Sequence, residues 1–151
     1  MKHLLIIYHS QSGSTLKLAE AIFKGASREA DVETRLLRAM EAGTEDLLWC
    51  DAILFGTPEN LGYMSGGLKD FFDRTFYPAL PHQLNIAYGI FVSAGNDGTG
   101  ATQQIQRIAK GYPLREVAEP VIVCGEVNAA GIKSCEELGH ALAAGLSLGI
   151  F

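Results

Sequence analysis

Cysteine is scarce in this chain of 151 residues, and the three that occur do not suit a disulfide framework. Cys50, Cys124 and Cys135 form no CxxC pair, and any pairing would leave one thiol over. A chain of this length buries a sizeable core without disulfides or a structural metal. We therefore expect a cytoplasmic protein with free thiols.

Basic charge is also sparse. The 12 Lys+Arg residues against 17 Asp+Glu give a formal net charge of −5, and no run of basic residues with interleaved aromatics occurs. Binding of nucleic acid needs clustered basic charge for the phosphates. We therefore expect no nucleic-acid partner.

Long apolar runs are missing as well. The run at Leu4–Ile7 is too short for a signal peptide, and no small-residue cleavage site follows it. The C-terminal stretch Leu138–Phe151 carries His140 and falls short of the roughly 20 residues that a membrane span requires. We expect neither a signal peptide nor a membrane span.

The residues that are plentiful suit one globular domain. Hydrophobic residues make up 48% of the chain, and 17 glycines exceed ordinary usage, which indicates several tight turns or close approaches to a ligand. No internal repeat, low-complexity tract or linker interrupts the chain. We expect a single domain over residues 1–151.

Short apolar runs recur along the chain and predict strands. They are continuous rather than alternating, which is typical of strands buried on both faces of a parallel sheet. These runs are Leu4–Tyr8, Ala52–Phe55, Ile86–Val92 and Pro120–Val123. Val32–Leu37 alternates between apolar and polar residues, so we expect an edge strand there.

Helical periodicity fills the intervals between these runs. Apolar stripes at helical spacing occupy Leu16–Ala26, Leu68–Phe76, Ala101–Tyr112 and Leu138–Gly145, and a weaker helix is expected at Glu45–Trp49. Alternation of strands and helices predicts an α/β fold, a doubly wound five-stranded parallel sheet with helices on both faces.

Ligands of such sheets bind beyond the carboxyl ends of the strands, where the strand order reverses. The loops after the first, third and fourth strands are rich in Gly, Ser, Thr or Asn. The crossover after the second strand offers nothing chemically suggestive.

The first of these loops predicts a phosphate site. It opens directly into a helix, whose first backbone N–H groups attract anions. No lysine is present, so the loop does not match those that bind nucleoside triphosphates. The other reading is a simple helix cap, but four hydroxyl residues within six positions exceed what capping needs. The residues expected on the phosphate are Ser10, Ser12, Gly13, Ser14 and Thr15.

Three motifs together resemble those of the flavodoxin-like FMN proteins, particularly their small NAD(P)H-dependent FMN and quinone reductases. They are Ser10-x-Ser12-Gly13-Ser14-Thr15, then Thr57-Pro58-x-x-x-Gly62-x-Met64-Ser65 with Leu68-Lys69-x-Phe71-Phe72-Asp73-Arg74, and finally Ser93–Gly100. The resemblance covers essentially the whole chain. It implies FMN as cofactor and NAD(P)H as co-substrate.

The resemblance also implies which residues hold the flavin ring. The second loop would flank the ring with Pro58, Glu59, Asn60, Leu61, Gly62 and Tyr63. The third loop would bind the pyrimidine edge with Ser93, Ala94, Gly95, Asn96, Asp97 and Gly98. Tyr63 either contacts the ring or is an ordinary loop tyrosine.

Three functions remain open at this point. The leading one is an oxidoreductase that passes electrons from NAD(P)H through FMN to a quinone, a flavin or a similar small acceptor. The second is a flavodoxin-type carrier that serves a redox partner protein, although the third loop lacks an aromatic residue. The third is a flavin-free binding module, suggested by Glu59, Asn60 and Leu61, where relatives often place an aromatic residue.

A protein with one domain has no separate nicotinamide domain, so the pyridine nucleotide would stack on the flavin, in a pocket that a second subunit could complete. We identify no metal site and no catalytic side chain, since the cofactor carries the chemistry. Of the isolated residues, His82 is either solvated or near the cofactor, and His9 either assists the anion or is packed. Cys124 is expected in the core, and Cys135 near a helix start that would lower its pKa.

Overall fold

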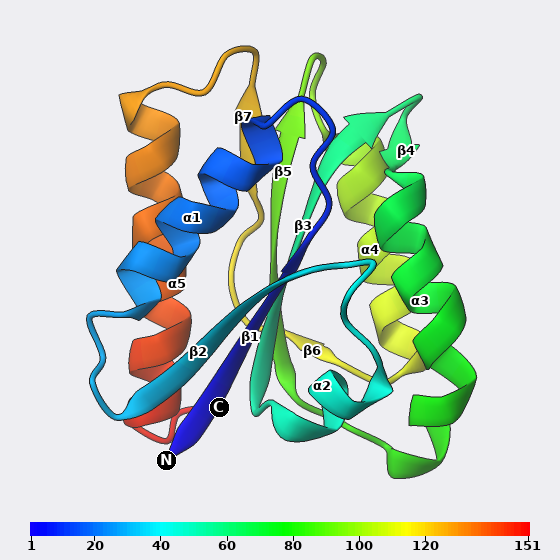
Figure 1. The fold of residues 1–151 in the computed structure, drawn as a ribbon, viewed down its shortest axis with the longest axis vertical. Helices are drawn as coiled ribbons and strands as arrows, with labels where there is room; N and C mark the ends of the chain where they lie inside the picture. The colour runs from blue at the N-terminus through cyan, green and yellow to red at the C-terminus, as the bar shows by residue number, and fades with distance from the viewer.

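A parallel β-sheet lies between two layers of helices in the computed structural model, which describes residues 1–151 (Figure 1). The strands are β1 (Lys2–Tyr8), β2 (Val32–Arg38), β3 (Ala52–Asn60), β4 (Tyr63–Met64), β5 (Ala87–Ala94), β6 (Arg115–Glu116) and β7 (Val121–Cys124). The helices are α1 (Ser14–Ala26), α2 (Thr44–Trp49), α3 (Gly66–Ala79), α4 (Thr99–Gly111) and α5 (Ala129–Ser147), with a 3₁₀ turn at Leu80–His82.

The strands are arranged in the order β2-β1-β3-β5, and both β6 and β7 pair with β5. All of these pairings are parallel, so the predicted α/β fold with a parallel sheet is confirmed. The fifth position of the sheet is divided: β6 pairs with the start of β5 and β7 with its end. The short strand β4 adds an antiparallel pairing to β3, which the sequence did not predict.

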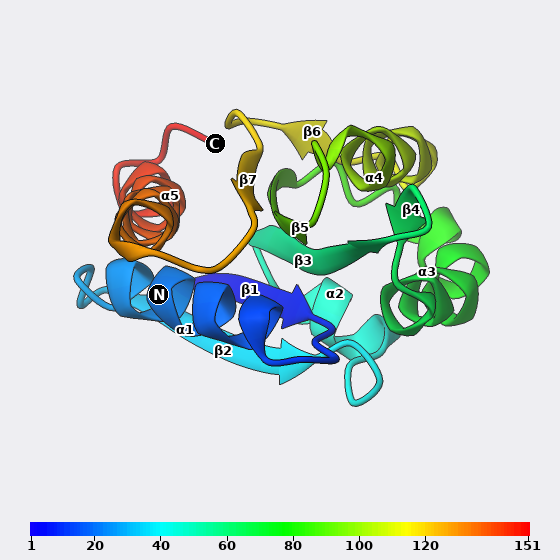
Figure 2. The ribbon, with the colours of Figure 1, turned by 90° about the horizontal axis from the view of Figure 1, so that it is seen from above.

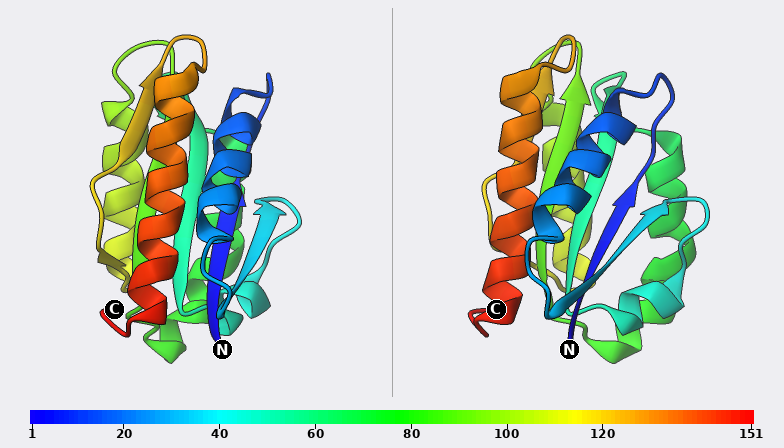
Figure 3. Two further views of the ribbon diagram at one scale, coloured as in Figure 1. Left: turned by 90° about the vertical axis from the view of Figure 1, so that its left-hand side faces the viewer. Right: turned by 60° about the vertical axis from the view of Figure 1, so that its left-hand side comes forward.

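Helices α1 and α5 cover one face of the sheet, and α2, α3 and α4 cover the other (Figures 2 and 3). Alternate residues of a strand point to opposite faces. Leu4 and Ile6 accordingly pack under α1 and α5, whereas Leu5 and Ile7 belong to the other core. This two-sided burial is the reason that the strands read as continuous apolar runs.

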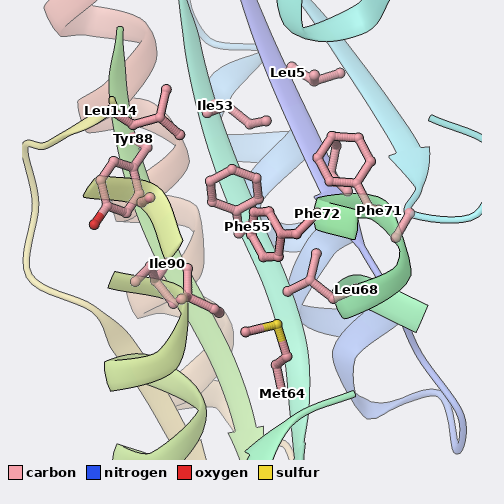
Figure 4. Packing of buried hydrophobic residues seen from close by; sticks show 14 of the residues in the cluster. Leu5, Ile53, Phe55, Met64, Leu68, Phe71, Phe72, Tyr88, Ile90 and Leu114 are labelled. Carbon is pink, nitrogen blue, oxygen red and sulfur yellow. The ribbon is translucent and has the colours of Figure 1, made fainter. Parts of the chain in front are cut away.

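Aromatic rings fill the core beneath α3 (Figure 4). The ring of Phe55 in β3 lies 5.0 Å from that of Phe72 and 6.5 Å from that of Phe71, measured between centroids. Tyr88 from β5 approaches Phe55 to 6.0 Å. Tilted aromatic pairs of this kind add to the burial of apolar area. The pairs of Phe55 with Phe71 and Phe72 hold α3, the helix that follows the second predicted loop, against the sheet.

Helices α1 and α5 approach each other through glycines. A Cβ atom at Gly25 would overlap the carbonyl oxygen of Glu136, and one at Gly139 would overlap that of Ile22. The two backbones are therefore in direct contact. Because α1 carries the first predicted loop at its start, this contact fixes the position of that loop against the sheet.

Two expected core residues are instead exposed. Phe23 was expected on the apolar stripe of the first helix, but its exposed fraction is 38%. Cys124 is exposed because it is the last residue of β7, at the edge of the sheet. No helix in the structure is both long enough and apolar enough to cross a membrane.

Candidate functional site

The three predicted loops meet at the carboxyl edge of the sheet (Figure 2). Strand β1 lies between β2 and β3, so the chain leaves β1 in one direction and returns on its other side. This reversal of strand order is where open α/β sheets bind their ligands. The site is therefore built from the ends of β1, β3 and β5.

The first loop leaves the start of α1 open to a ligand. Gly13 adopts a positive φ of 101° and caps α1 without a side-chain hydrogen bond. Its N–H donates to Ser10 Oγ at 3.1 Å, whereas the N–H groups of Ser14, Thr15 and Leu16 have no acceptor. Unpaired amides at a helix start form an anion site. The structure thus provides the donors that the predicted phosphate site requires.

Other helix starts are capped by side chains. Ser65 accepts from Leu68 N–H at the start of α3, and Asn128 accepts from Gly131 N–H at the start of α5. At the start of α2, Asp46 accepts only from the N–H of Gly43, which precedes the helix. In α3 and α5 a side chain thus takes up an amide of the first turn, whereas in α1 none does.

A crevice of about 490 Å³ adjoins the first loop on its β2 side. It is lined by Tyr8, His9, Ser10, Gln11, Ser12, Gly13, Leu16, Arg38, Met40 and Glu41. Arg38 is exposed and has no carboxylate within ion-pair distance. The crevice is thus lined by the last residue of β2 and by two residues of the crossover that follows it, where we expected nothing chemically suggestive. Arg38 is the last residue of β2, which lies beside β1 in the parallel sheet. Because parallel strands end at the same edge of a sheet, its position after a predicted strand was the one sign in the sequence that Arg38 lies near the first loop.

His9 lies between the first loop and α3. Its ring contacts Gly67, where a Cβ atom would overlap the imidazole. The Nδ1 atom is buried and has no hydrogen-bond partner in the protein. Buried polar atoms are usually paired, so this unpaired nitrogen is an exception in a residue that lines the crevice.

The second loop forms a β-hairpin, which the sequence did not predict. Strand β3 continues through Asn60, and β4 begins at Tyr63. The two residues between them, Leu61 and Gly62, have positive φ angles of 55° and 73°. This is the backbone of a tight two-residue hairpin turn. It carries Leu61, which is fully exposed, to the tip.

Tyr63 does not line the crevice beside the first loop. Its side chain lines a groove between α3 and α4, together with Phe72, Phe76 and Arg107. The exposed tip of the hairpin is Leu61 rather than this half-buried tyrosine. That Tyr63 contacts a flavin ring stays a prediction.

The third loop joins β5 to α4. Ser93 and Ala94 end β5 and are buried, Gly95 and Asn96 are exposed, and Gly98 precedes α4 with a φ of 72°. Asp97 accepts hydrogen bonds from Thr99 N–H at 3.0 Å and from Thr99 Oγ1 at 2.8 Å. These two bonds, that from the backbone first, lower the pKa of Asp97. Its carboxylate is therefore ionised and engaged within the loop.

Direct hydrogen bonds link the three loops to one another. Asn60 Nδ2 donates to Gln11 Oε1 at 2.8 Å, across the mouth between the first loop and the hairpin. The hydroxyls of Thr15 and Ser93 lie 2.8 Å apart and join the first loop to the third. Glu59 accepts from the N–H of Gly98 and so joins the hairpin to the third loop. Segments predicted separately from the sequence thus form one connected site.

Of the two readings of His82 the solvated one holds, whereas the expectation for the thiol of Cys135 does not. His82 is exposed in the 3₁₀ turn after α3, at the opposite edge of the sheet from the three loops (Figure 1). Cys135 is buried within α5, and this burial raises the pKa of its thiol to about 12 rather than lowering it. A thiol beyond the first turn of a helix gains little from the helix dipole. Neither residue belongs to the site.

The fold and the joined loops define a flavodoxin-like α/β protein with unpaired amides at the start of its first helix. The model of the family described as NADPH-dependent FMN reductase matches residues 37–128, more than half of the chain. The chain belongs to this family. Its implied cofactor is FMN and its implied co-substrate is NAD(P)H.

Curated relatives match parts of the chain. A flavodoxin from Aquifex aeolicus is 41% identical over 48% of this chain and 40% of its own length. An NAD(P)H dehydrogenase (quinone) from Archaeoglobus fulgidus is 34% identical over 50% of this chain and 52% of its own length. The chain spans about half the length of the curated relatives it matches.

Solved structures match the fold over nearly the whole chain. A flavodoxin from the domain Archaea superposes with a TM-score of 0.85 at 20% identity, covering 96% of this chain and 99% of that one. A WrbA-like flavodoxin from Agrobacterium tumefaciens gives 0.80 at 22% identity, covering 95% and 96%. At these identities the likeness concerns the fold alone.

The residues present fit FMN. The open amides of Ser14, Thr15 and Leu16 suit its phosphate. The exposed turn at Leu61 and Gly62 gives backbone groups and an apolar side chain for a flat ring.

Proposed function

We propose that this chain is an FMN oxidoreductase that passes electrons from NAD(P)H through FMN to a quinone, a flavin or a similar small acceptor. The observation that carries the proposal is the uncapped start of α1, joined by hydrogen bonds to both of the other loops. The family's dependence on NADPH supports the electron donor. The names of the quinone dehydrogenase relatives support a small-molecule acceptor.

In this proposal the first loop binds the phosphate of FMN. Backbone N–H groups and hydroxyls from Ser10, Ser12, Gly13, Ser14 and Thr15 surround it. The hydroxyl of Thr15 is already paired with Ser93, so Thr15 contributes its backbone N–H. Arg38 adds a positive charge from the neighbouring crevice. A phosphate next to a helix start and a guanidinium is favoured as a dianion.

The ring would lie against the hairpin and the third loop. From the hairpin we assign Pro58, Glu59, Asn60, Leu61, Gly62 and Tyr63, and from the third loop Ser93, Ala94, Gly95, Asn96, Asp97 and Gly98. When bound, FMN supplies the hydride and electron transfer. The chain's own residues would hold the ring, with Leu61 at the exposed tip of the hairpin.

Residues 1–151 form one domain in this proposal, so donor and acceptor use the same exposed face in turn. Such alternation gives ping-pong kinetics. A second subunit would complete the pocket for the pyridine nucleotide. We place the protein in the cytoplasm.

The competing function is a flavodoxin-type electron carrier for a redox partner protein. It is favoured by the 41% identity of the matching segment to the flavodoxin from Aquifex aeolicus. A carrier would receive its electrons from another protein rather than from NAD(P)H directly. The two functions therefore differ in one measurable step.

That step is tested by anaerobic mixing of FMN-loaded protein with NADH or with NADPH. We expect either nucleotide to bleach the visible flavin band rapidly, with turnover on adding a benzoquinone. Bleaching by dithionite but by neither nucleotide would favour the carrier. Protein that neither retains nor takes up FMN would leave a flavin-free module.

A further inference from the structure

Glu59 reaches from the end of β3 to the beginning of α4. Its Oε1 accepts from the N–H of Gly98 at 3.2 Å, and its Oε2 accepts from the N–H of Ala101, also at 3.2 Å. Both carboxylate oxygens are therefore taken by amides of one helix start. The side chain connects the hairpin with the end of the third loop.

A second contact joins the same two elements. Gly62 of the hairpin turn lies against Gly100 in the first turn of α4, where a Cβ atom would overlap the carbonyl oxygen of Gly62. The same Cβ would lie 3.2 Å from Glu59 Oε2. Only glycine allows this approach, so the hairpin rests directly on the helix start. Figure 1 shows β4 and α4 side by side in this region.

The charge of Glu59 is balanced by these amides alone. No lysine, arginine or histidine lies within ion-pair distance of its carboxylate. A carboxylate at a helix start is stabilised by the partial positive charge of the first turn, and hydrogen bonds to a charged acceptor are stronger than neutral ones. Both carboxylate oxygens of Glu59 are thus engaged with the start of α4.

We propose that Glu59 is a positioning residue that joins the hairpin Asn60–Tyr63 and the loop Gly95–Gly98 into one preformed wall for the flavin ring. The inference rests on the proposed function, because it assumes that this wall receives the ring. The proposal predicts different effects of Glu59 on the binding of the flavin ring and of the phosphate. The hydrogen bonds of Glu59 go to Gly98 and Ala101 and none goes to the first loop, so we expect the ring's share of the affinity to depend on Glu59 and the phosphate's share not to.

Glu59→Gln is the principal test. Glutamine keeps the size but has one acceptor oxygen, and its NH₂ group faces an N–H donor. We expect the affinities for FMN and for riboflavin to fall by the same factor, about tenfold. Competition by inorganic phosphate for the first loop should not change. The matched control is Glu116→Gln, an exposed carboxylate that accepts only from Gln106, which should leave all three affinities unaltered.

Two further variants keep the test independent of one substitution. Glu59→Asp retains the charge but is one methylene shorter, so its loss of riboflavin affinity should be smaller than that of Glu59→Gln. Gly100→Ala separates the hairpin from α4 by a different route and should give the same pattern. The combined Glu59→Gln and Gly100→Ala variant should lose less than the product of the two single losses, because both open one joint.

The decisive measurements are flavin titrations of the folded variants, together with the visible circular dichroism of bound FMN, which reports the surroundings of the ring. A changed spectrum with unchanged competition by phosphate supports the proposal. A Glu59→Gln variant that loses thermal stability but keeps wild-type flavin affinities and spectrum overturns it, as does an equal loss of affinity for phosphate. Wild-type protein without affinity for FMN would instead overturn the proposed function.

Hydrogen exchange of the backbone amides tests the contact between Glu59 and α4 without FMN. Exchange at Gly98 and Ala101 should be slow in wild type and fast in Glu59→Gln.

Discussion

The hydroxyl groups of Thr15 and Ser93 lie 2.8 Å apart, although 78 positions separate the two residues in the chain. Thr15 is in the first turn of α1 and Ser93 is near the end of β5, and both are buried. This bond connects the predicted phosphate loop to the third loop through the interior. Because neither hydroxyl reaches water, each depends on the other for a partner.

Replacing Thr15 by valine should therefore destabilise the protein by about 1–3 kcal/mol, since the buried Ser93 hydroxyl loses its partner. The change keeps the shape of the side chain. Ser93→Ala should have a similar effect, and the double variant should be more stable than the sum of the single effects predicts. Urea denaturation measures all four proteins. Strict additivity would show that the two hydroxyls do not depend on each other.

Arg38→Gln should weaken FMN binding by about three- to tenfold at low salt and should leave riboflavin binding unchanged, because riboflavin lacks the phosphate. The salt dependence of FMN affinity should become shallower in the same variant. Isothermal titration at several ionic strengths measures both effects. Arg107→Gln, which removes an equally unpaired arginine from the α3–α4 groove, is the control. Equal losses for FMN and riboflavin in Arg38→Gln would remove Arg38 from the phosphate site.

The thiol of Cys124 should react with a disulfide reagent much faster than the thiols of Cys50 and Cys135. Cys124 is exposed, whereas burial raises the pKa of Cys50 and of Cys135 to about 12 each. Because the thiolate is the reactive species, a disulfide reagent at pH 8 should modify Cys124 rapidly and the other two only on unfolding. Mass spectrometry of the native protein should show a single adduct. Rapid loss of all three thiols from folded protein would contradict the described packing.

Gly139→Ala should destabilise the protein by about 1–3 kcal/mol, because its Cβ atom would overlap the backbone of Ile22 in α1. Gly66→Ala serves as the control, since a Cβ atom there meets nothing within 4 Å. An alanine at this exposed helical position should be neutral or slightly stabilising. Thermal unfolding of both variants checks the contact. Equal stability of the two would mean that α1 and α5 are not in backbone contact.

The sequence predicted the parallel sheet because the central strands are buried on both faces. Leu4 to Ile7 are fully buried, with alternate side chains in the two cores. Such a segment needs an apolar residue at every position, and this pattern is visible without a structure. The exposure of Phe23 could not be predicted in the same way. Helical spacing shows that a residue lies near the apolar face of its helix, but it does not show how far around the helix the neighbouring elements bury that face.

The hairpin could not be predicted from local preferences. Leu61 adopts a positive φ, a conformation that branched apolar residues rarely take and that the sequence does not announce. Only the adjacent Gly62 carried a turn signal. The turn is stabilised by the pairing of Asn60 with Tyr63 and by the contact between Gly62 and Gly100 of α4. The second of these contacts is distant in sequence, so local preferences do not reveal it.

Residues that act across loops were the hardest to assign. The position of Glu59 at the end of a strand predicts that it lies near the site. Its hydrogen bonds, however, go to Gly98 and Ala101, which are 39 and 42 positions away in the chain. Arg38 was overlooked because its segment carries no motif. Its relevance comes from strand order, which places the end of β2 beside the end of β1.

The central claim is that the first loop binds the phosphate of FMN, and a titration of FMN into wild type and Ser12→Glu tests it most directly. The exposed serine accommodates either replacement sterically, so Ser12→Gln serves as the neutral control. Quenching of flavin fluorescence should show saturable binding to wild type and to Ser12→Gln. Binding to Ser12→Glu should be abolished, because its carboxylate repels the phosphate. Unchanged affinity of Ser12→Glu for FMN would contradict the account.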